Sequence, residues 1–310
     1  MYKWVIIGGG IHGCTIAVYL VKSGKVKPDE LLIVDRYEEP LHKWSTITSK
    51  IGMDFLRSPI VHHIDLDPFS LQNYIKSTSG VNGFLGRYKR PRLDLFNEHC
   101  LALLDSISID KVWYQVEVND IRSFNGKWRI YTEQDHLIET NNVILALGVN
   151  EQPAFPEWTL PLRDRNPDKV KHIFEENTDV TAEVGDVCII GGGLSAAHLA
   201  VKLSTASKRK VTLVKRHPFR VHDFDSDPGW LGPKCLTKYN KVTDLSERRL
   251  LITKARNKGS MPQNMLFKLK RCQASQHLEV IDDQVITASY KNDKLQLSFE
   301  ENDMKEFSMI

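Results

Sequence analysis

Apolar and polar residues follow the same order twice along this chain of 310 residues. Near the amino terminus a short apolar run, Trp4–Ile7, leads into three glycines and then into apolar residues at helical spacing as far as Gly24. The order returns with the apolar run Val187–Ile190, three more glycines and the helical segment Leu194–Leu203. Short apolar runs that stop at glycine are typical of buried strands, so each copy predicts a strand, a tight turn and a helix.

The glycines of the first copy have a spacing that suits a dinucleotide. Gly8, Gly10 and Gly13 form G-x-G-x-x-G, in which the first glycine permits the sharp turn, the second admits a pyrophosphate and the third lets helix pack on strand. The anion then lies at the positive end of the helix dipole. The second copy reads G-x-G-x-x-A, with Gly191, Gly193 and Ala196 at the same places. One such motif is a weak signal, but a repeated motif indicates two nucleotide sites.

The two copies differ in charge where their second strand ends. The first ends in Asp35-Arg36 and the second in Lys215-Arg216. A carboxylate suits the free ribose hydroxyls of FAD, whereas two cations suit the 2′-phosphate of NADP. We therefore interpret the first copy as an FAD site and the second as an NADP site, while solvated strand-end charges remain the alternative for Lys215 and Arg216.

The rest of the chain completes two domains. Further strands are predicted over Val112–Val118, Trp128–Thr132, Asn142–Leu147, Val280–Tyr290 and Leu295–Phe299. Further helices are predicted over Leu71–Ser77, Leu93–Leu104, Leu245–Ala255 and Asn264–Arg271, and Tyr37–Lys50 is read as a polar, turn-rich segment. Prolines at 153, 156 and 161 mark a linker, so we place an FAD-binding domain at 1–155 and an NADP-binding domain at 156–310.

The end of the chain repeats an earlier order. The last strands follow one another as those of residues 112–132 do, and Phe307–Ile310 begins where Val143–Leu147 would follow. By that comparison the chain stops inside a strand, at the start of a return to the FAD domain. A truncated sequence and a version without a closing segment both stay open.

Composition narrows the class of protein. Hydrophobic residues make up 41% and charged residues 26%, which is typical of a globular protein, and the net charge of +3 is too small to favour nucleic acid or a membrane surface. No apolar stretch reaches membrane-spanning length. The five cysteines include no C-x-x-C pair, which favours a reducing, cytoplasmic setting and argues against a dithiol-disulfide reductase. His222, Asp223 and Asp225 could suggest metal ligands, but no partner cluster matches them, so no metal is predicted.

Taken together, these motifs resemble the flavoproteins with two dinucleotide-binding domains, and most closely the NADPH-dependent N-hydroxylating monooxygenases that act on lysine or ornithine. The resemblance is carried by G-G-G-I-H-G at 8–13, H-K-W at 42–44, M-D-F-L-R-S-P at 53–59, F-S-L-Q-N-Y at 69–74, A-L-G at 146–148 and G-G-G-L-S-A-A at 191–197. This chain has Ile11 where the group often has Pro, and Leu194 where it often has Gln. For that reason no substrate-binding residue is carried over.

The resemblance implies an α/β fold of two Rossmann-like domains, each of three layers (ββα) with a β-meander, the NADP domain being inserted in the FAD domain. The residues it implies for FAD are Gly8, Gly10, Ile11, His12, Gly13, Asp35, Arg36, Trp44, Arg57, Leu147 and Gly148. Those for NADP are Gly191, Gly193, Leu194, Ser195, Ala196, Lys215 and Arg216. Trp44 as a core residue and Arg57 as an ordinary ion-paired arginine are the alternatives.

The chemistry implied is hydride transfer from NADPH to FAD, reaction of the reduced flavin with dioxygen to a C4a-hydroperoxide, and transfer of one oxygen to a small amine or sulfur substrate. No catalytic side chain is assigned, because the protein has to position the rings and exclude water rather than supply a nucleophile. A homo-oligomer is left open. The alternatives are an NADPH-dependent flavin reductase without oxygen insertion and a non-catalytic nucleotide-binding redox sensor.

Overall fold

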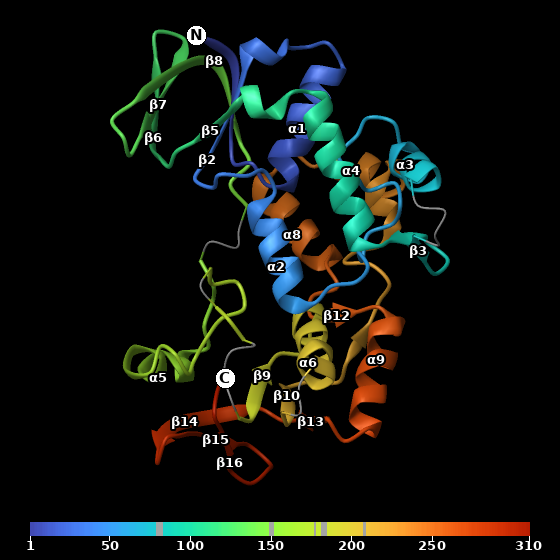
Figure 1. Ribbon diagram of the computed structural model, residues 1–310, viewed down its shortest axis with the longest axis vertical. Coiled ribbons are helices and arrows are strands. Elements are labelled where there is room, and N and C mark those ends of the chain that lie inside the picture. Colours follow the sequence, from blue (N-terminus) through green and yellow to red (C-terminus); the bar gives the residue numbers. More distant parts are fainter. Residues whose placement is uncertain (79–82, 149–151, 177, 181–184, 207–208) are drawn as a thin grey trace. The chain divides into compact units, whose positions relative to one another are not determined.

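The computed structural model describes residues 1–78, 83–148, 152–176, 178–180, 185–206 and 209–310 (Figure 1). By its contacts the chain divides into two units: Met1–Ser49 with Met53–Gln152, and Lys50–Gly52 with Pro153–Ile310. Each unit contains parallel strands, helices and antiparallel strands in a meander. The predicted mixed α/β class is therefore confirmed.

The first unit is built on one sheet of six strands in the order β5-β2-β1-β8-β7-β6. Its strands are β1 (Tyr2–Ile7), β2 (Leu31–Asp35), β5 (Trp113–Gln115), β6 (Val118–Phe124), β7 (Lys127–Thr132) and β8 (Leu137–Leu145). The pairs β5-β2, β2-β1 and β1-β8 are parallel, while β8-β7 and β7-β6 are antiparallel. Strand β8 is long enough to belong to both parts, since its first half pairs with β7 and its second half runs beside β1.

Alternate residues of the parallel strands face two different layers. Ile6 and Ile33 pack in the same cluster as the helices, whereas Val5 and Val34 pack against residues of β7 and β8. The helices of this unit are α1 (Ile11–Lys22), α2 (His42–Ile51), α3 (Ser70–Thr78) and α4 (Leu93–Ser106), and α1 and α4 lie side by side (Figure 1). Short elements are η1 (Pro28–Glu30), η2 (Ile109–Lys111) and the hairpin of β3 (Phe84–Leu85) and β4 (Arg90–Pro91).

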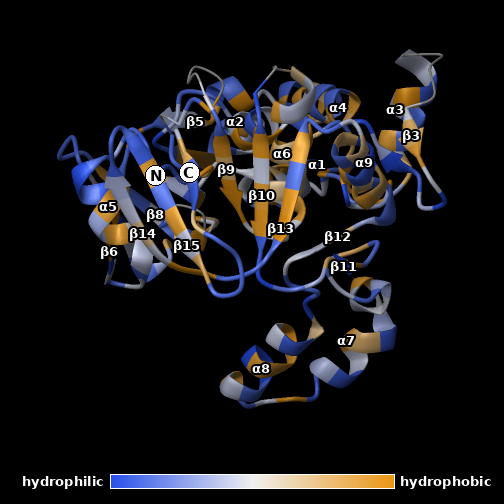
Figure 2. Cartoon of the chain, turned by 90° about the horizontal axis from the view of Figure 1, so that it is seen from below, coloured by the Kyte–Doolittle hydropathy of each residue, from blue (hydrophilic) through white to orange (hydrophobic). Residues whose placement is uncertain are grey.

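The second unit repeats this arrangement on a smaller sheet. Its parallel strands β9 (Val187–Ile190), β10 (Val211–Lys215) and β13 (Leu278–Asp282) lie in the order β13-β10-β9 and are apolar along most of their length (Figure 2). Residues of α6 (Leu194–Ala206) and α9 (Gln263–Ala274) cover one face. The other face packs against the antiparallel meander of β14 (Val285–Lys291), β15 (Lys294–Phe299) and β16 (Lys305–Phe307).

The remaining elements of the second unit connect these layers. They are η3 (Glu157–Thr159), α5 (Leu160–Arg165), β11 (Arg220–Val221), η4 (Pro228–Leu231), α7 (Pro233–Tyr239), α8 (Leu245–Ala255) and β12 (Ser260–Met261). Helices α7 and α8 contain no fully buried residue and stand away from the sheet of their own unit (Figure 2).

The internal comparison made from the sequence is confirmed at the last residues. Met309 forms a parallel bridge with Val187 of β9, and the Cys188 N–H donates to the Met309 carbonyl at 2.9 Å. This is the place that β8 takes beside β1 in the first unit. Two predicted strands were wrong in one respect, because each is a pair of strands with a corner between them: 112–118 contains β5 and the start of β6, and 280–290 contains parts of β13 and β14.

A second correction concerns the segment Tyr37–Lys50, which was predicted to be turn-rich and instead contains helix α2. Its apolar positions Trp44, Ile47 and Ile51 have the helical spacing i, i+3, i+7. The short length and the polar residues between them hid that pattern.

Candidate nucleotide-binding turns

The first glycine turn is fixed by backbone contacts that leave no room for side chains. Gly8 has φ +106°, a conformation that L-residues with a Cβ rarely adopt, and an added Cβ would lie 2.4 Å from the Ala146 carbonyl oxygen. At Gly13 an added Cβ would lie 1.8 Å from the Gly8 carbonyl oxygen, so helix α1 rests directly on the turn. The turn is joined to β2 by the Gly8 N–H, which donates to the Val34 carbonyl at 2.8 Å.

Gly10 differs from its neighbours because its Cα faces open space. No atom lies within 4 Å of an added Cβ there, and Gly10 is the N-cap of α1. The first N–H groups of a helix have no partner inside the helix, so those that follow Gly10, on Ile11 and His12, are available to an anion. Ile11 is half-buried against the core, and the His12 side chain is exposed. The open space beside a helix N-terminus fits a pyrophosphate.

Asp35 stands at the end of β2, facing this turn. One carboxylate oxygen accepts the Gly9 N–H at 2.5 Å and the other accepts the Tyr37 N–H at 2.9 Å. A carboxylate has about four acceptor positions, so these two bonds orient the group and leave acceptors for ribose hydroxyls. Arg36 is exposed, and it donates to the Tyr37 hydroxyl at 2.7 Å.

Trp113 is a residue of this turn that sequence reasoning missed. Its indole lies on Gly9, where an added Cβ would be 1.9 Å from Cη2 and 2.4 Å from Cζ3, and its N–H donates to the Tyr37 carbonyl at 3.2 Å. Gly9, the middle glycine of the three, is therefore a packing glycine. The sequence signal for Trp113 is only its place at the start of β5, which pairs with β2 from Ile33 onward.

Of the remaining residues predicted for FAD, some lie beside the turn and others belong to elements elsewhere in the first unit. The segment 146–148 is close to it, since the Ala146 N–H donates to the Ile7 carbonyl at 2.8 Å; Leu147 is exposed and Gly148 has φ +73°. Trp44 on α2 packs against the α4 residue Phe96, and its indole N–H donates to the Asn97 side chain at 2.9 Å.

The contacts of Trp44 with Phe96 and Asn97 agree with the alternative given for Trp44 from the sequence, that of a core packing residue. Arg57 is half-buried in the segment between α2 and α3.

The cysteine nearest the first turn is not a reactive thiol. Cys14 is fully buried, its thiol approaches the Gly9 carbonyl at 3.2 Å, and burial together with the negative charge of Asp35 raises its pKa to about 12. Burial likewise raises the pKa of Cys100 and Cys188. All five cysteines are free. A thiol stays protonated under such conditions, so none of these three buried groups acts as a nucleophile.

The second turn has the same construction. Gly191 has φ +142°, and its N–H donates to the Val214 carbonyl of β10 at 2.8 Å, the counterpart of the bond from Gly8. Helix α6 begins directly after Gly193 with Leu194, and the side chains of Leu194, Ser195 and Ala196 in its first turn are half-buried.

Two residues beside the second turn were not predicted. An added Cβ on Gly192 would lie 3.5 Å from Cε1 of His217, and one on Gly193 would lie 3.4 Å from Cα of Gly259. His217 belongs to the polar, aromatic segment that follows β10, which is a signal for a residue near a site, whereas Gly259 precedes β12 and carries no such signal.

The two cations at the end of β10 have different surroundings. The Lys215 side chain is 6% exposed, forms an ion pair with Asp282 of β13 and donates to the His217 carbonyl at 3.3 Å. Its ammonium also lies 4.8 Å from the centre of the Phe219 ring. Arg216 is exposed. Within the described part of the chain, no ion pair is found for Arg216.

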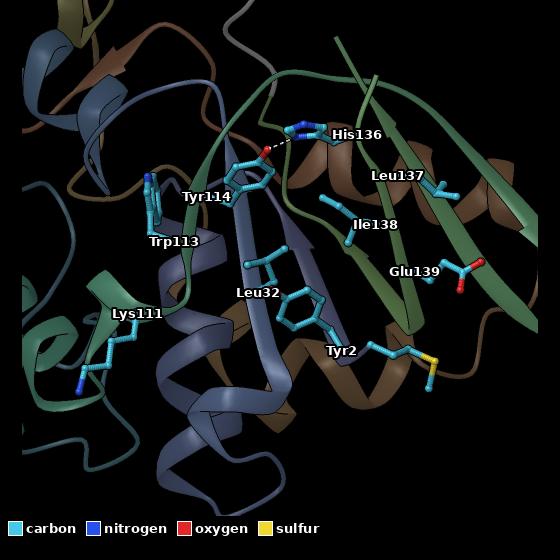
Figure 3. A pocket seen from close by; sticks show the side chains of 10 residues that line it. Tyr2, Leu32, Lys111, Trp113, Tyr114, His136, Leu137, Ile138 and Glu139 are labelled. Carbon is cyan, nitrogen blue, oxygen red and sulfur yellow. Dashed lines mark hydrogen bonds between the residues drawn. The ribbon is translucent and has the colours of Figure 1, made fainter. Parts of the chain in front are cut away.

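A pocket of about 820 Å³ opens in the first unit (Figure 3). It is lined by Met1, Tyr2, Leu32, Lys111, Trp113, Tyr114, His136, Leu137, Ile138 and Glu139. The Tyr114 hydroxyl and Nδ1 of His136 share a hydrogen bond of 2.6 Å at its rim (Figure 3). Tyr2 at the start of β1 lies about 20 Å from Gly8 at 3.3 Å per residue, but Trp113, which also packs on Gly9, lines the pocket, so the pocket extends from the start of β1 to the ring that contacts the glycine turn.

The described residues include no group of three or more His, Cys, Asp or Glu side chains that could hold a metal ion. Among the same residues, no helix is both long and apolar enough to cross a membrane.

The chain is similar in fold to known N-hydroxylases. The ornithine hydroxylase of Pseudomonas aeruginosa superposes with a TM-score of 0.76 at 16% identity over 99% of this chain and 81% of that one. The ornithine N-hydroxylase of Kutzneria sp. 744 gives 0.74 at 14% identity over 100% and 79%. The resemblance stated from the sequence is thus confirmed at the level of the fold.

Sequence comparison places the chain in a wider group. Monodehydroascorbate reductase 3 of Arabidopsis thaliana is 26% identical over 226 residues, which are 72% of this chain and 45% of that protein, so the chain spans about half the length of this curated relative. The family model described as pyridine nucleotide-disulphide oxidoreductase matches residues 2–229, which include both glycine turns. The chain therefore belongs to the pyridine nucleotide-disulphide oxidoreductase family.

Proposed function

We propose that this protein is an FAD- and NADPH-dependent monooxygenase that hydroxylates a small amine or sulfur compound, with FAD on the first turn and NADPH on the second. The observation that carries the proposal is the repeated turn. In both units a glycine with positive φ donates to the neighbouring strand at 2.8 Å, and a helix begins within three residues of it. Two such turns suit two dinucleotides.

The first turn fits FAD in three respects. Gly8 and Gly13 exclude side chains, Gly10 leaves the space beside the helix N-terminus open, and Asp35 is held in place by two N–H donors with acceptors to spare. Bound FAD would accept a hydride from NADPH and deliver the electron pair to dioxygen. The work of this chain's residues is to bind and orient: backbone N–H groups of α1 hold the pyrophosphate and Asp35 holds the ribose.

The second turn would hold NADPH in the same manner. The N-terminus of α6, beginning at Leu194, would meet the pyrophosphate, and the Ser195 hydroxyl in its first turn would donate to a phosphate oxygen. The exposed Arg216 favours a 2′-phosphate. The Kutzneria relative was solved with reduced FAD, NADP+ and L-ornithine, which supports this pair of cofactors and a small amine as the substrate class.

For an amine the overall reaction consumes one dioxygen, one NADPH and one proton, and it yields the hydroxylamine, NADP+ and water. The test is to incubate the FAD-loaded protein with NADPH and a series of amines (ornithine, lysine, cadaverine) and to measure NADPH oxidation and hydroxylamine together. Hydroxylamine formed in step with NADPH supports the proposal. NADPH oxidation that gives only hydrogen peroxide with every amine and sulfur compound supports the flavin reductase instead.

A further inference from the structure

The two cations that end β10 are adjacent in the sequence but are not equally available to a ligand. Lys215 is 6% exposed at its side chain, so a water molecule scarcely reaches it. A phosphate oxygen is no smaller than a water molecule and therefore cannot reach it either, unless the side chain moves. Arg216, the next residue along the strand end, is exposed.

Three contacts hold Lys215 where it is. Its ammonium pairs with the Asp282 carboxylate, donates to the His217 carbonyl at 3.3 Å and lies over the Phe219 ring at 4.8 Å. Lys215 and Asp282 are also register partners in the parallel pair of β10 and β13, and the Asp283 N–H donates to the Lys215 carbonyl at 2.9 Å. The Asp282 side chain is 54% exposed, so Lys215 is the buried member of the pair, and its ammonium would be left as an unpaired buried charge if it stayed in place without the carboxylate, which is costly.

We infer that Arg216 alone discriminates NADPH from NADH at the second turn, and that Asp282 keeps Lys215 out of that role. This inference rests on the proposed function, because it concerns the ribose end of the NADPH site. Asp282 is then a specificity-determining residue although its negative charge would itself repel a phosphate: its carboxylate neutralises the second cation and limits the positive charge facing the 2′-phosphate to one arginine.

The test uses two ligands that differ only in the 2′-phosphate, adenosine 2′,5′-bisphosphate and adenosine 5′-monophosphate. Their dissociation constants are measured by calorimetry on the full FAD-loaded chain. The constant for adenosine 5′-monophosphate divided by that for adenosine 2′,5′-bisphosphate gives a ratio that increases with discrimination in favour of the 2′-phosphate. We expect Arg216→Ala to lower the ratio about tenfold or more, as loss of a charge-assisted hydrogen bond does. Lys215→Met should leave it within twofold, and Asp282→Asn should raise it severalfold because Lys215 is then released.

Lys215→Met could disturb folding, so the double variant Lys215→Met/Asp282→Asn, which removes both partners, is measured beside it. Asp303→Asn, an exposed carboxylate elsewhere in the same unit, is the matched control for the loss of a negative charge. The inference is overturned if the double variant loses discrimination tenfold, if Arg216→Ala keeps it, or if Asp282→Asn lowers the ratio. A native chain that binds both ligands equally well would instead refute the NADPH site itself.

Discussion

The packing of Trp113 on Gly9 gives the sharpest test of the first turn. Gly9→Ala would place a Cβ 1.9 Å and 2.4 Å from two indole carbons, whereas carbon atoms in contact lie about 3.5–4.0 Å apart. The φ of Gly9 is not positive, so alanine adds no backbone strain and the clash is the main cost. The indole has to move by roughly 1 Å or more to make room for the methyl group. We therefore expect Gly9→Ala to lower the free energy of unfolding by about 3 kcal/mol, the upper end of the range for overpacked cores.

The assay is a double-mutant cycle on the apoprotein, in which unfolding by urea is monitored by circular dichroism and fluorescence. Trp113→Leu alone should destabilise by about 3 kcal/mol through the cavity it leaves. The double variant should cost little more than Trp113→Leu, because the shorter side chain makes room for the new methyl group, which gives a coupling energy of about 3 kcal/mol. Additive costs in the double variant would refute the contact, and with it the geometry described for this turn.

Two further predictions concern binding and pH. Gly10→Val should weaken FAD binding at least tenfold, measured by flavin fluorescence, with little effect on the free energy of unfolding. The reason is that a Cβ on Gly10 meets no protein atom within 4 Å but fills the space assigned to the pyrophosphate. The control is Gly232→Val, at the N-cap glycine of α7 with equal open space, which should leave FAD binding unchanged. Burial lowers the pKa of His99, which is 2% exposed, from 6.5 to about 4, so the unfolded chain binds its proton first as the pH falls and stability is lost between about pH 7 and pH 4. The loss attributable to His99 should be about 2 kcal/mol at pH 5, and His99→Phe should reduce the difference in urea-unfolding free energy between pH 7 and pH 5 by that amount; an unchanged difference would contradict the assigned pKa.

His99 also shows where sequence patterns stop being informative. Its Nε2 lies 2.8 Å from the Ser70 hydroxyl, which donates to Asp65 at 2.6 Å, and Asp65 pairs with Lys22 at 2.6 Å. These residues come from α1, α3, α4 and the segment before α3. Nothing in their spacing along the chain marks them as neighbours, because only the packing of the helices brings them together.

What the sequence did predict are features set by local physics. Glycine spacing, strand-length apolar runs and helical periodicity depend on residues close in the chain, and on them the two turns were placed correctly, as was α8 at Leu245–Ala255. Lys215 shows the opposite case. Its neighbour in the sequence is Arg216, but its environment is set by Asp282, 67 residues further on. The burial of a charge by a distant strand cannot be inferred from the charge itself.

The central claim is that one chain holds FAD on its first turn and NADPH on its second, with hydride passing between them. The most direct measurement is the visible absorption spectrum of the purified protein, supplemented with FAD, before and after anaerobic addition of NADPH. A bound-flavin spectrum that bleaches with NADPH, and more slowly with NADH, is the predicted result. A protein that binds no flavin even with excess FAD, or a bound flavin that NADPH does not reduce, would contradict the claim.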